Sequence, residues 1–429
     1  MVQRMTRRRV ARGAATVLVA AGLAGWGLAA PVTARAAEPI KIGFGMALSG
    51  GLAAVGKTGL LAMQIWEADI NAKGGLLGRP VKLVFYDDQS SPSTVPGIYT
   101  KLLDVDKVDF VVSGYATNQV APAMPVVMAA DKVFLGLFAL DANGEFRYQK
   151  YFSMLPTGSD PKVDFSKGFF AAAAALDPKP KTVALVGADA EFSKNALDGA
   201  RLNAKDAALN VVYDRTYPPS TTDYTPIVRA IQAANPDIVY VASYPPDSVG
   251  MVRAINEVGL KARLMGGGMV GVQITAIKTQ LGPLLNGFTS YDWWVPSDKM
   301  KAFPGVEDFL KKYQAQAPGQ GVDPLGYYLP IFAYSYLQVL GDAIAATKGL
   351  DQDKVADYIR THNFDTLAGD IRFGKNGEWE KPRVLMVQYH NIKGNDVDQF
   401  RTINHEVVFY PAEYKTGDVT TPFVPEGKK

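Results

Sequence analysis

Short apolar stretches alternate with longer amphipathic stretches along the chain from Ile40 onward. The short stretches are rich in β-branched residues, which is typical of strands, and the longer ones have the length of helices. Strands are predicted at Ile40–Ala47, Val81–Tyr86, Asp109–Ser113, Val133–Phe138, Thr182–Val186, Val211–Tyr213 and Ile238–Ala242. Helices are predicted between them near residues 52–73, 95–105, 120–131, 162–176, 192–208, 224–233 and 246–258. This alternation predicts an α/β fold with parallel sheets covered by helices.

The pattern pauses at residues 151–161 and then resumes, which indicates that one α/β unit ends and another begins. Residues 302–361 have a helical pattern, late strands are predicted at 371–373 and 384–390, and the tail after Asn391 has no clear periodicity. This order predicts a chain that returns to the first unit and then to the second. We therefore expect lobe 1 to comprise residues 37–157 and 292–366, and lobe 2 to comprise residues 158–291 and 367–429 with an irregular C-terminal tail.

Two apolar stretches have the composition of membrane segments. The stretch from Pro324 to Gly341 is uncharged but contains tyrosines and a proline, so a buried aromatic-rich helix is predicted there. The other follows the basic residues at the N-terminus and ends at Ala34-Arg35-Ala36, a small-residue pattern suited to a signal peptidase. Residues 1–36 are therefore predicted to be a cleaved export signal. A twin-arginine signal, a general secretory signal and an uncleaved anchor all remain open.

The charge and the cysteine content limit the compartments and the partner classes that suit this protein. The whole chain has 45 basic and 42 acidic residues, and residues 1–36 contain six arginines and no acid. The mature protein would carry 39 basic against 42 acidic residues, a net charge of about −3, which does not favour nucleic acid as a partner. The chain has no cysteine, so disulfides, thiolate metal sites and a lipid-anchoring cysteine are excluded. We expect a free periplasmic protein.

Motifs for enzymatic chemistry have weak support. Residues Gly51–Thr58 match the phosphate-loop pattern, but an exported protein would lack nucleoside triphosphates. Residues Gly266–Gly271 match G-x-G-x-x-G, although three adjacent glycines more simply allow a close approach of the backbone. The three histidines are too far apart in sequence to form a helical metal pair. We expect no enzyme activity, no cofactor and no metal site.

The remaining candidates are loops that follow predicted strands, where ligands bind in open α/β sheets. The loop Ser113–Asn118 leads into a helix whose N-terminal amides favour an anion. The loop Gly136–Asp141 follows the next strand of the same unit, and the loops at 188–194 and 242–247 take the equivalent places in the second unit. Tyr291, Trp293, Trp294, Tyr327 and Tyr328 form an aromatic-rich region where the chain is expected to cross between the units.

Several segments resemble the leucine/isoleucine/valine-binding family of periplasmic receptors for ABC importers. Ile40-Lys41-Ile42-Gly43 and Leu48-Ser49-Gly50 are similar to the family's first strand and loop, Glu67–Gly78 to its first-helix exit, and Tyr86-Asp87-Asp88 to its second strand. The resemblance covers residues 40–391. It implies a type I periplasmic-binding-protein fold with two parallel-sheet lobes, three crossovers near Pro156, Tyr291 and Thr366, and a ligand cleft between the lobes.

The resemblance also implies a set of site residues. In this family a hydroxyl-bearing residue helps to hold the carboxylate of the solute, and Thr117 matches that residue. Phe192 and Tyr244 match two aromatic residues of the family's binding pocket. Gly268 and Leu140 stand where amino-acid receptors have an ammonium-binding acid and a threonine. With the loop residues, the predicted ligand-binding set is Ser49, Val55, Tyr115, Ala116, Thr117, Asn118, Phe138, Ala139, Leu140, Phe192, Tyr244, Gly268, Met269, Trp293 and Tyr327.

A buried ammonium without an anionic partner has a large desolvation cost, on the order of several kcal/mol. The sequence therefore predicts a monomeric periplasmic solute-binding protein that captures a small apolar or aromatic carboxylate without an α-ammonium and delivers it to a membrane ABC permease. A branched-chain amino-acid or amide receptor and a sensor subunit for signalling are the alternatives.

Overall fold

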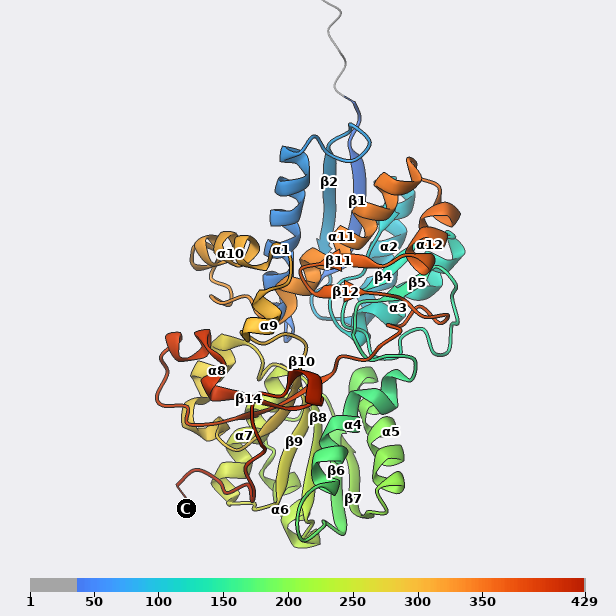
Figure 1. Cartoon of the computed structure of the whole chain (residues 1–429). Helices are drawn as coiled ribbons and strands as arrows, with labels where there is room; N and C mark the ends of the chain where they lie inside the picture. The colour runs from blue at the N-terminus through green and yellow to red at the C-terminus, as the bar shows by residue number, and fades with distance from the viewer. Residues whose placement is uncertain (1–36, 428–429) are drawn as a thin grey trace, which may run out of the picture. The chain divides into compact units, whose positions relative to one another are not determined.

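The computed structural model describes residues 37–427, so the predicted export signal lies outside the described residues. One sheet near the start of the chain has the strand order β2-β1-β3 with parallel neighbours (Figure 1). Its strands are β1 (Ile40–Met46), β2 (Val81–Asp87) and β3 (Phe110–Val111). A parallel pair, β4 (Phe134–Gly136) and β5 (Tyr151–Ser153), continues beyond β3 through a backbone bond of 3.0 Å from Ser113 N to Leu135 O.

Close packing explains the glycines in β1. A Cβ added at Gly43 would lie 3.0 Å from side-chain atoms of Leu102 and Val108, so the strand approaches its covering helix closely. The helices that cover this sheet are α1 (Ala53–Ala72), α2 (Val95–Asp104) and α3 (Thr117–Ala129). We call the segments packed around this sheet lobe 1.

A second sheet, which organises lobe 2, has the order β14-β13-β10-β9-β8-β6-β7. The strands from β7 to β10 are parallel, whereas β13 and β14 run antiparallel to their neighbours. The strands are β6 (Thr182–Ala188), β7 (Asn210–Tyr217), β8 (Ile238–Ser243), β9 (Leu264–Met269), β10 (Thr289–Asp292), β13 (Leu385–Tyr389) and β14 (Glu406–Tyr410).

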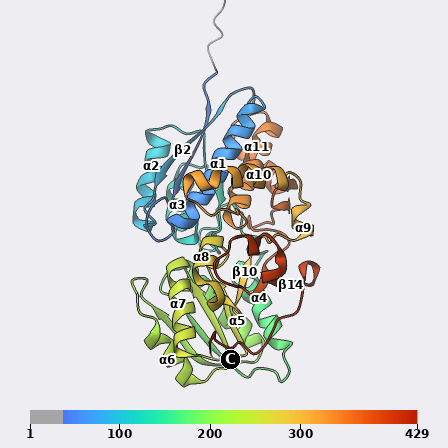
Figure 2. The ribbon, with the colours of Figure 1, turned by 90° about the vertical axis from the view of Figure 1, so that its left-hand side faces the viewer.

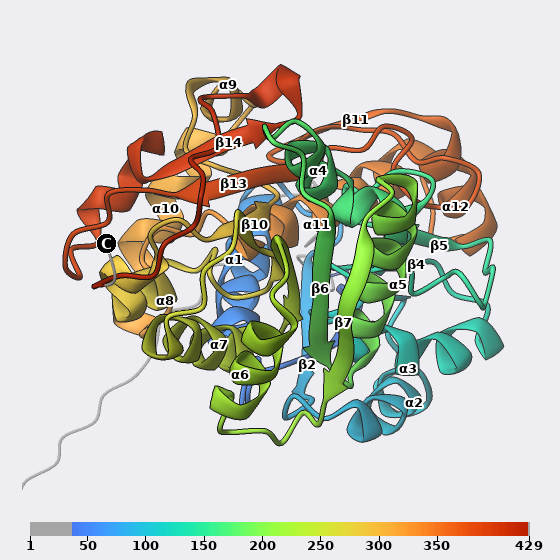
Figure 3. The same cartoon turned by 90° about the horizontal axis from the view of Figure 1, so that it is seen from below.

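Helices cover both faces of the second sheet. Figure 3 shows α4 and α5 on one face and α6 and α7 on the other. Their bounds are α4 (Pro161–Ala174), α5 (Glu191–Asp206), α6 (Thr225–Ala234), α7 (Pro245–Val258) and α8 (Thr275–Leu281). Short 3₁₀ turns are η1 (Pro92–Thr94), η2 (Gly282–Leu285), η3 (Asp398–Arg401), η4 (Ile403–His405) and η5 (Ala412–Tyr414). The predicted α/β arrangement is confirmed in both sheets.

The helical block between β10 and β13 belongs mainly to lobe 1. It comprises α9 (Asp298–Lys301), α10 (Val306–Gln320), α11 (Leu329–Thr347) and α12 (Gln352–Thr361). Helices α10 and α11 lie beside α1 in Figure 2, and Asp69 of α1 bonds to Lys312 (2.5 Å) and to the Tyr334 hydroxyl (2.9 Å). Among the described residues, α11 is long and apolar enough to span a membrane, but 78% of its most apolar window is buried within the protein. The predicted buried helix is confirmed.

The late chain differs from the sequence prediction in two places. No strand is predicted at the glycine motif, but Gly266 to Gly268 lie within β9, where a Cβ at Gly266 would come within 2.1 Å of Thr289 O. The tail after Asn391 was expected to lack regular structure, yet β14 pairs with β13. A glycine-rich strand and a short edge strand both escape a periodicity analysis, because neither has alternating apolar and polar positions.

The chain passes between the two sheets in three places, after β5, after β10 and before β13. The first and third passages are joined by a backbone bond of 2.8 Å from Arg383 N to Pro156 O. A hairpin of β11 (Phe364–Thr366) and β12 (Gly369–Ile371) precedes the third passage, so the predicted lobe boundary after Thr366 falls inside this hairpin. The lobe boundaries themselves stay a prediction.

Candidate ligand-binding site

A small cavity of about 20 Å³ lies where loops from both sheets meet. This volume is far below the range for small-molecule sites and is enough for about one water molecule, so the lobes must separate to admit a solute. The lining residues follow the carboxyl ends of strands in both sheets or lie where the chain passes between them: Tyr115, Ala116, Thr117, Phe138, Leu140, Leu155, Phe192, Tyr244, Val270, Tyr291, Trp293 and Tyr328. The position agrees with the rule that ligands bind outside the carboxyl ends of parallel strands.

The first turn of α3 provides hydrogen-bond donors at this cavity. The helix begins at Thr117, three residues earlier than predicted, and the first backbone amides of a helix have no acceptor within the helix itself. The Thr117 hydroxyl oxygen accepts a bond from Leu140 N (2.9 Å), which leaves its own proton available. Unpaired amides at a helix N-terminus, supported by the helix dipole, favour a carboxylate or another anion.

The backbone on either side of this turn is strained. Ala116 has φ 85° and ψ 148°, a region that residues other than glycine rarely adopt, and Phe138 has φ 56°. Such conformations cost on the order of 1–3 kcal/mol and occur preferentially at functional sites. Both residues line the cavity, although other non-glycine residues of the lobe, such as Lys107 and Asp131, also have positive φ.

Two residues of lobe 2 donate hydrogen bonds to Asn118 of lobe 1 and so close the cavity. The Asn118 side-chain oxygen accepts bonds from the Tyr244 hydroxyl (2.9 Å) and from Phe192 N (3.3 Å), and these residues lie at the N-termini of α7 and α5. Asn195 of α5 adds a bond of 2.9 Å from its amide nitrogen to Leu140 O. The N-termini of three helices therefore converge beside the cavity, which adds positive potential where an anion would bind.

Aromatic rings make up most of the interior of the cavity. The Phe138 ring lies 5.2 Å from Tyr328 and 5.7 Å from Trp293, and Trp293 lies 4.8 Å from Tyr291. The hydroxyls of Tyr291 and Tyr328 are 2.9 Å apart and share a hydrogen bond. Rings at these spacings form a rigid apolar wall that can surround a flat or branched apolar group.

The cavity lining contains hydrogen-bond donors but no charged side chain. None of its twelve residues is Asp, Glu, Lys, Arg or His. Burial raises the pKa of Tyr115, Tyr244, Tyr291 and Tyr328 above the usual value, so their hydroxyls stay protonated at neutral pH. The site can thus stabilise an anionic oxygen with neutral donors, whereas an ammonium group would find no carboxylate here.

Eight of the fifteen predicted site residues line the cavity: Tyr115, Ala116, Thr117, Phe138, Leu140, Phe192, Tyr244 and Trp293. Asn118 does not line it but bonds to two residues at its edge and, with Tyr244, borders a neighbouring hollow between the lobes. Val55, Ala139 and Met269 are buried in the apolar core. Tyr327 stacks on Trp294 at 5.0 Å, while its neighbour Tyr328 lines the cavity.

Gly268, which the sequence singled out as a site residue, packs against the core instead. A Cβ at Gly268 would lie 2.8 Å from the Tyr240 hydroxyl, so this position faces the core of lobe 2, and Val270 is the residue of this segment that lines the cavity. Sequence reasoning missed Leu155, Val270, Tyr291 and Tyr328 as site residues. The aromatic-rich region was the available signal for the two tyrosines; Leu155 and Val270 carried none, because apolar residues after strands are usually core.

The phosphate-loop match has an ordinary structural explanation. Helix α1 begins at Ala53, so the residues that would cradle a phosphate are already helical. The Thr58 hydroxyl donates to Val55 O (2.6 Å), and a Cβ at Gly56 would lie 2.0 Å from Ala47 O. These glycines and the threonine pack the helix onto the end of β1 and leave no loop of free amides for phosphate.

Ser49 belongs to the same strand-end turn. Its hydroxyl donates to Asp87 Oδ2 (2.6 Å), and the Asp87 carboxylate also accepts bonds from the amides of Leu48 and Gln89. Burial alone would raise the pKa of Asp87, but these hydrogen bonds together lower it. The ionised Asp87 carboxylate therefore stabilises the turn through these hydrogen bonds. Among residues 37–427, no group of three or more acidic or histidine side chains could hold a metal ion.

Comparison with known proteins identifies the family to which this chain belongs. The profile of the periplasmic binding protein family matches residues 39–389, and the chain belongs to this family, in the type I branch that includes the branched-chain amino-acid receptors. A curated relative, Leu/Ile/Val-binding protein homolog 8 of Brucella abortus, is 25% identical over 387 residues, covering 88% of this chain and 94% of its own. The family and the type I fold predicted from the sequence are confirmed.

Solved structures of the same fold have different bound ligands. A branched-chain amino-acid transporter substrate-binding protein from Streptococcus pneumoniae, in complex with isoleucine, has a TM-score of 0.68 and 19% identity, covering 82% of this chain and 97% of its own. A solute-binding protein of an ABC transporter from R. palustris, in complex with benzoate, has a TM-score of 0.71 and 16% identity, covering 90% and 98%. These two structures share the fold, and the family match identifies the chain as a solute-binding protein of the ABC-transporter type.

Proposed function

We propose that this protein captures a small apolar or aromatic carboxylate that lacks an α-ammonium and delivers it to a membrane ABC permease. The observation that carries the proposal is the lining of the cavity. The N-terminal turn of α3, the Thr117 hydroxyl and protonated tyrosines offer donors to a carboxylate, and no acidic side chain lines the cavity to pair with an ammonium. A benzoate complex in a protein of the same fold supports this ligand class.

Binding rather than catalysis is the proposed mechanism. The carboxylate would be held at the first turn of α3 in lobe 1, and the apolar group would contact Phe192, Tyr244 and the other rings. Because those two residues also bond to Asn118, ligand contacts and lobe contacts act on the same closed state. A ligand shifts the equilibrium toward closure only through its higher affinity for that state.

The cellular setting is part of the proposal. The family is periplasmic, and residues 1–36 have the composition of a cleaved export signal. Without a cysteine, the mature protein would be free in the periplasm rather than lipid-anchored, and its proposed state is a monomer. The permease would recognise the closed, loaded form.

A thermal-shift panel on the mature protein tests the ligand class. Benzoate, 3-phenylpropanoate, 4-methylpentanoate, leucine and magnesium-ATP would each be added at saturating concentration. Ligand at 100 times its Kd adds about 2.7 kcal/mol to the free energy of unfolding, which is an easily measured shift. We expect stabilisation by at least one ammonium-free acid. Strong stabilisation by leucine with none by the three acids would contradict the proposal.

A further inference from the structure

A buried arginine lies where the three passages between the two sheets come together. Arg383 belongs to the third passage and is 7% exposed, and its backbone amide bonds to Pro156 O of the first passage (2.8 Å). Its guanidinium lies over the ring of Phe303, which follows the second passage and α9, at 5.4 Å, and over the ring of Trp379 in its own passage at 5.1 Å. Arg383 therefore contacts residues in or next to all three passages, which are the segments that must bend when the lobes move.

The hydrogen-bonding capacity of this guanidinium is only partly used. Nε and Nη2 of Arg383 are buried and bond to no atom of the described residues. Aromatic rings attract a cation, but they do not replace the oxygen acceptors that N–H groups have in water. Burial lowers the pKa of Arg383 by more than a side-chain hydrogen bond with Tyr414 and the nearby acidic side chains raise it. The buried guanidinium therefore destabilises the arrangement in which it is found.

That arrangement is the one in which the lobes are closed. Asn118 of lobe 1 bonds to Tyr244 of lobe 2 (2.9 Å), and the cavity beside them has room for about one water molecule. Opening the lobes changes the backbone at the passages, so the surroundings of Arg383 change with it. Water or the carboxylates of Glu413 and Asp370, which already interact with its charge, can then reach the free N–H groups. Closure thus has a free-energy cost at Arg383 that the open arrangement lacks.

On the basis of the hinge closure in the proposed function, we propose that Arg383 is a positioning residue that opposes closure of the empty protein and so keeps the lobes open until a solute binds. A solute that contacts both lobes offsets the cost at Arg383 through its higher affinity for the closed state. The apparent affinity then depends on the fraction of the protein that closes without solute. Arg383 would therefore set the affinity for every solute by the same factor, without touching any of them.

The variant Arg383→Met tests this inference, because it keeps a long side chain beside the two rings and removes every N–H group. Small-angle scattering of solute-free mature protein should give a smaller radius of gyration for Arg383→Met than for wild type. Calorimetry should show affinities about tenfold higher, by the same factor for each acid that binds. Arg360→Met is the matched control and should change neither quantity. Arg360 also lies over a ring, that of Phe152 at 5.4 Å, but it belongs to α12 and its guanidinium donates to Gln149 O.

Two further measurements separate this role from a merely structural one. Arg383→Lys retains a buried cation and should keep the radius of the solute-free wild type. In wild type labelled with ¹⁵N-arginine, the Arg383 Nε–H should exchange with solvent more slowly when solute is bound, which tests the inference even if Arg383→Met fails to fold.

Three results would overturn the inference while the proposed function stands. These are a radius of solute-free Arg383→Met equal to or larger than that of wild type, affinity changes that differ from one acid to the next, and equal Nε–H exchange with and without solute. Failure of every acid in the panel to bind would instead overturn the proposed function. The radius of the solute-free protein tests Arg383 separately from that outcome, because no solute takes part in it.

Discussion

At the scale of single residues, Thr117 combines two tasks at the candidate site. Its hydroxyl oxygen accepts the Leu140 amide, and its proton remains available for a ligand carboxylate. Thr117→Val should lower carboxylate affinity about tenfold, because a net hydrogen bond to a charged group contributes about 1.5 kcal/mol. Calorimetry with the acid that the thermal-shift panel identifies measures this. Thr58→Val is a matched control, because Thr58 is equally buried and donates within α1; equal affinities in wild type and Thr117→Val would contradict this role.

The buried Glu378 predicts how the free energy of unfolding changes with pH. Its side chain is buried, one carboxylate oxygen has no partner among residues 37–427, and burial raises its pKa to about 8. The folded protein therefore keeps this proton up to about pH 8, while the unfolded chain releases it near pH 4.3. Stability should fall as pH rises through this window, by up to about 1.4 kcal/mol per pH unit from this group.

Glu378→Gln removes that titration and keeps the shape of the side chain. Urea unfolding at pH 5 and pH 8 should show a smaller loss of stability with rising pH in this variant than in wild type. Glu380→Gln is the control, because Glu380 is exposed two residues away and should leave the pH dependence unchanged. The same slope in wild type and Glu378→Gln would contradict the assignment.

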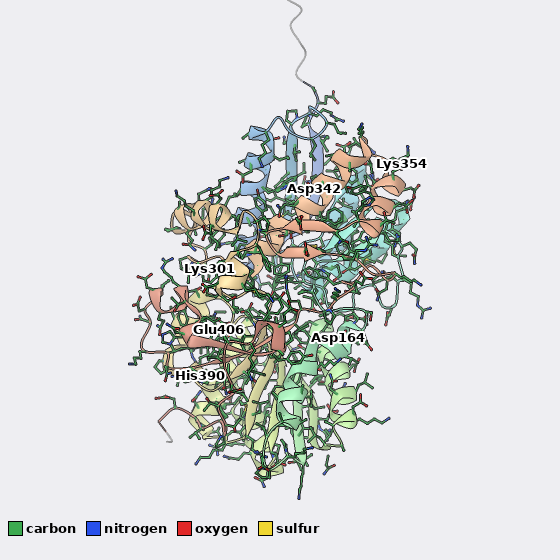
Figure 4. All side chains as sticks on the ribbon, viewed as in Figure 1. Asp164, Lys301, Asp342, Lys354, His390 and Glu406 are labelled. Carbon is green, nitrogen blue, oxygen red and sulfur yellow. The ribbon has the colours of Figure 1, made fainter. Side chains whose placement is uncertain are left out.

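At the scale of elements, a buried ion pair fastens the edge of the second sheet. Lys278 of α8 pairs with Glu406 of β14, which Figure 4 labels, and both side chains are about 95% buried. Burial raises the pKa of the nearby Asp292, as does the Glu406 charge. Asp292 accepts a bond from Trp293 N (2.7 Å), so this cluster also supports the cavity wall.

Removing one partner of a buried pair leaves an unpaired charge. Lys278→Met should therefore destabilise the fold by about 3–5 kcal/mol. Lys299→Met breaks the exposed Lys299–Glu413 pair and should cost less than about 1 kcal/mol. The two free energies of unfolding, measured in urea, should differ clearly, and similar values would show that the buried pair has no special role.

The elements that sequence reasoning found are those with strong periodicity. Strand β1 and helix α1 were placed within a residue of their bounds, since buried apolar runs and glycine breaks mark them. Strands β9 and β14 were missed, because half of the first is glycine and the second is a short edge strand. Polar and aromatic site residues on strand-end loops could be predicted, whereas Val270 and Leu155 could not, because apolar residues after strands are usually part of the core.

At the scale of the whole molecule, the account requires two lobes that close on a ligand. Contacts such as Asn118 with Tyr244 and Asn195 with Leu140 join them in the described state. Small-angle scattering of mature protein should show a smaller radius of gyration with a saturating carboxylate than without it. An unchanged radius with bound ligand would contradict hinge closure as the consequence of binding.

The central claim is that the site accepts a carboxylate and rejects an ammonium. Calorimetry with two pairs of compounds tests it most directly, because each pair differs only in the α-ammonium: 4-methylpentanoate with leucine, and 3-phenylpropanoate with phenylalanine. The account predicts binding of at least one acid and an affinity at least a hundredfold lower for its amino-acid partner, since a buried ammonium without a carboxylate costs several kcal/mol. Equal or tighter binding of the amino acids would contradict the account.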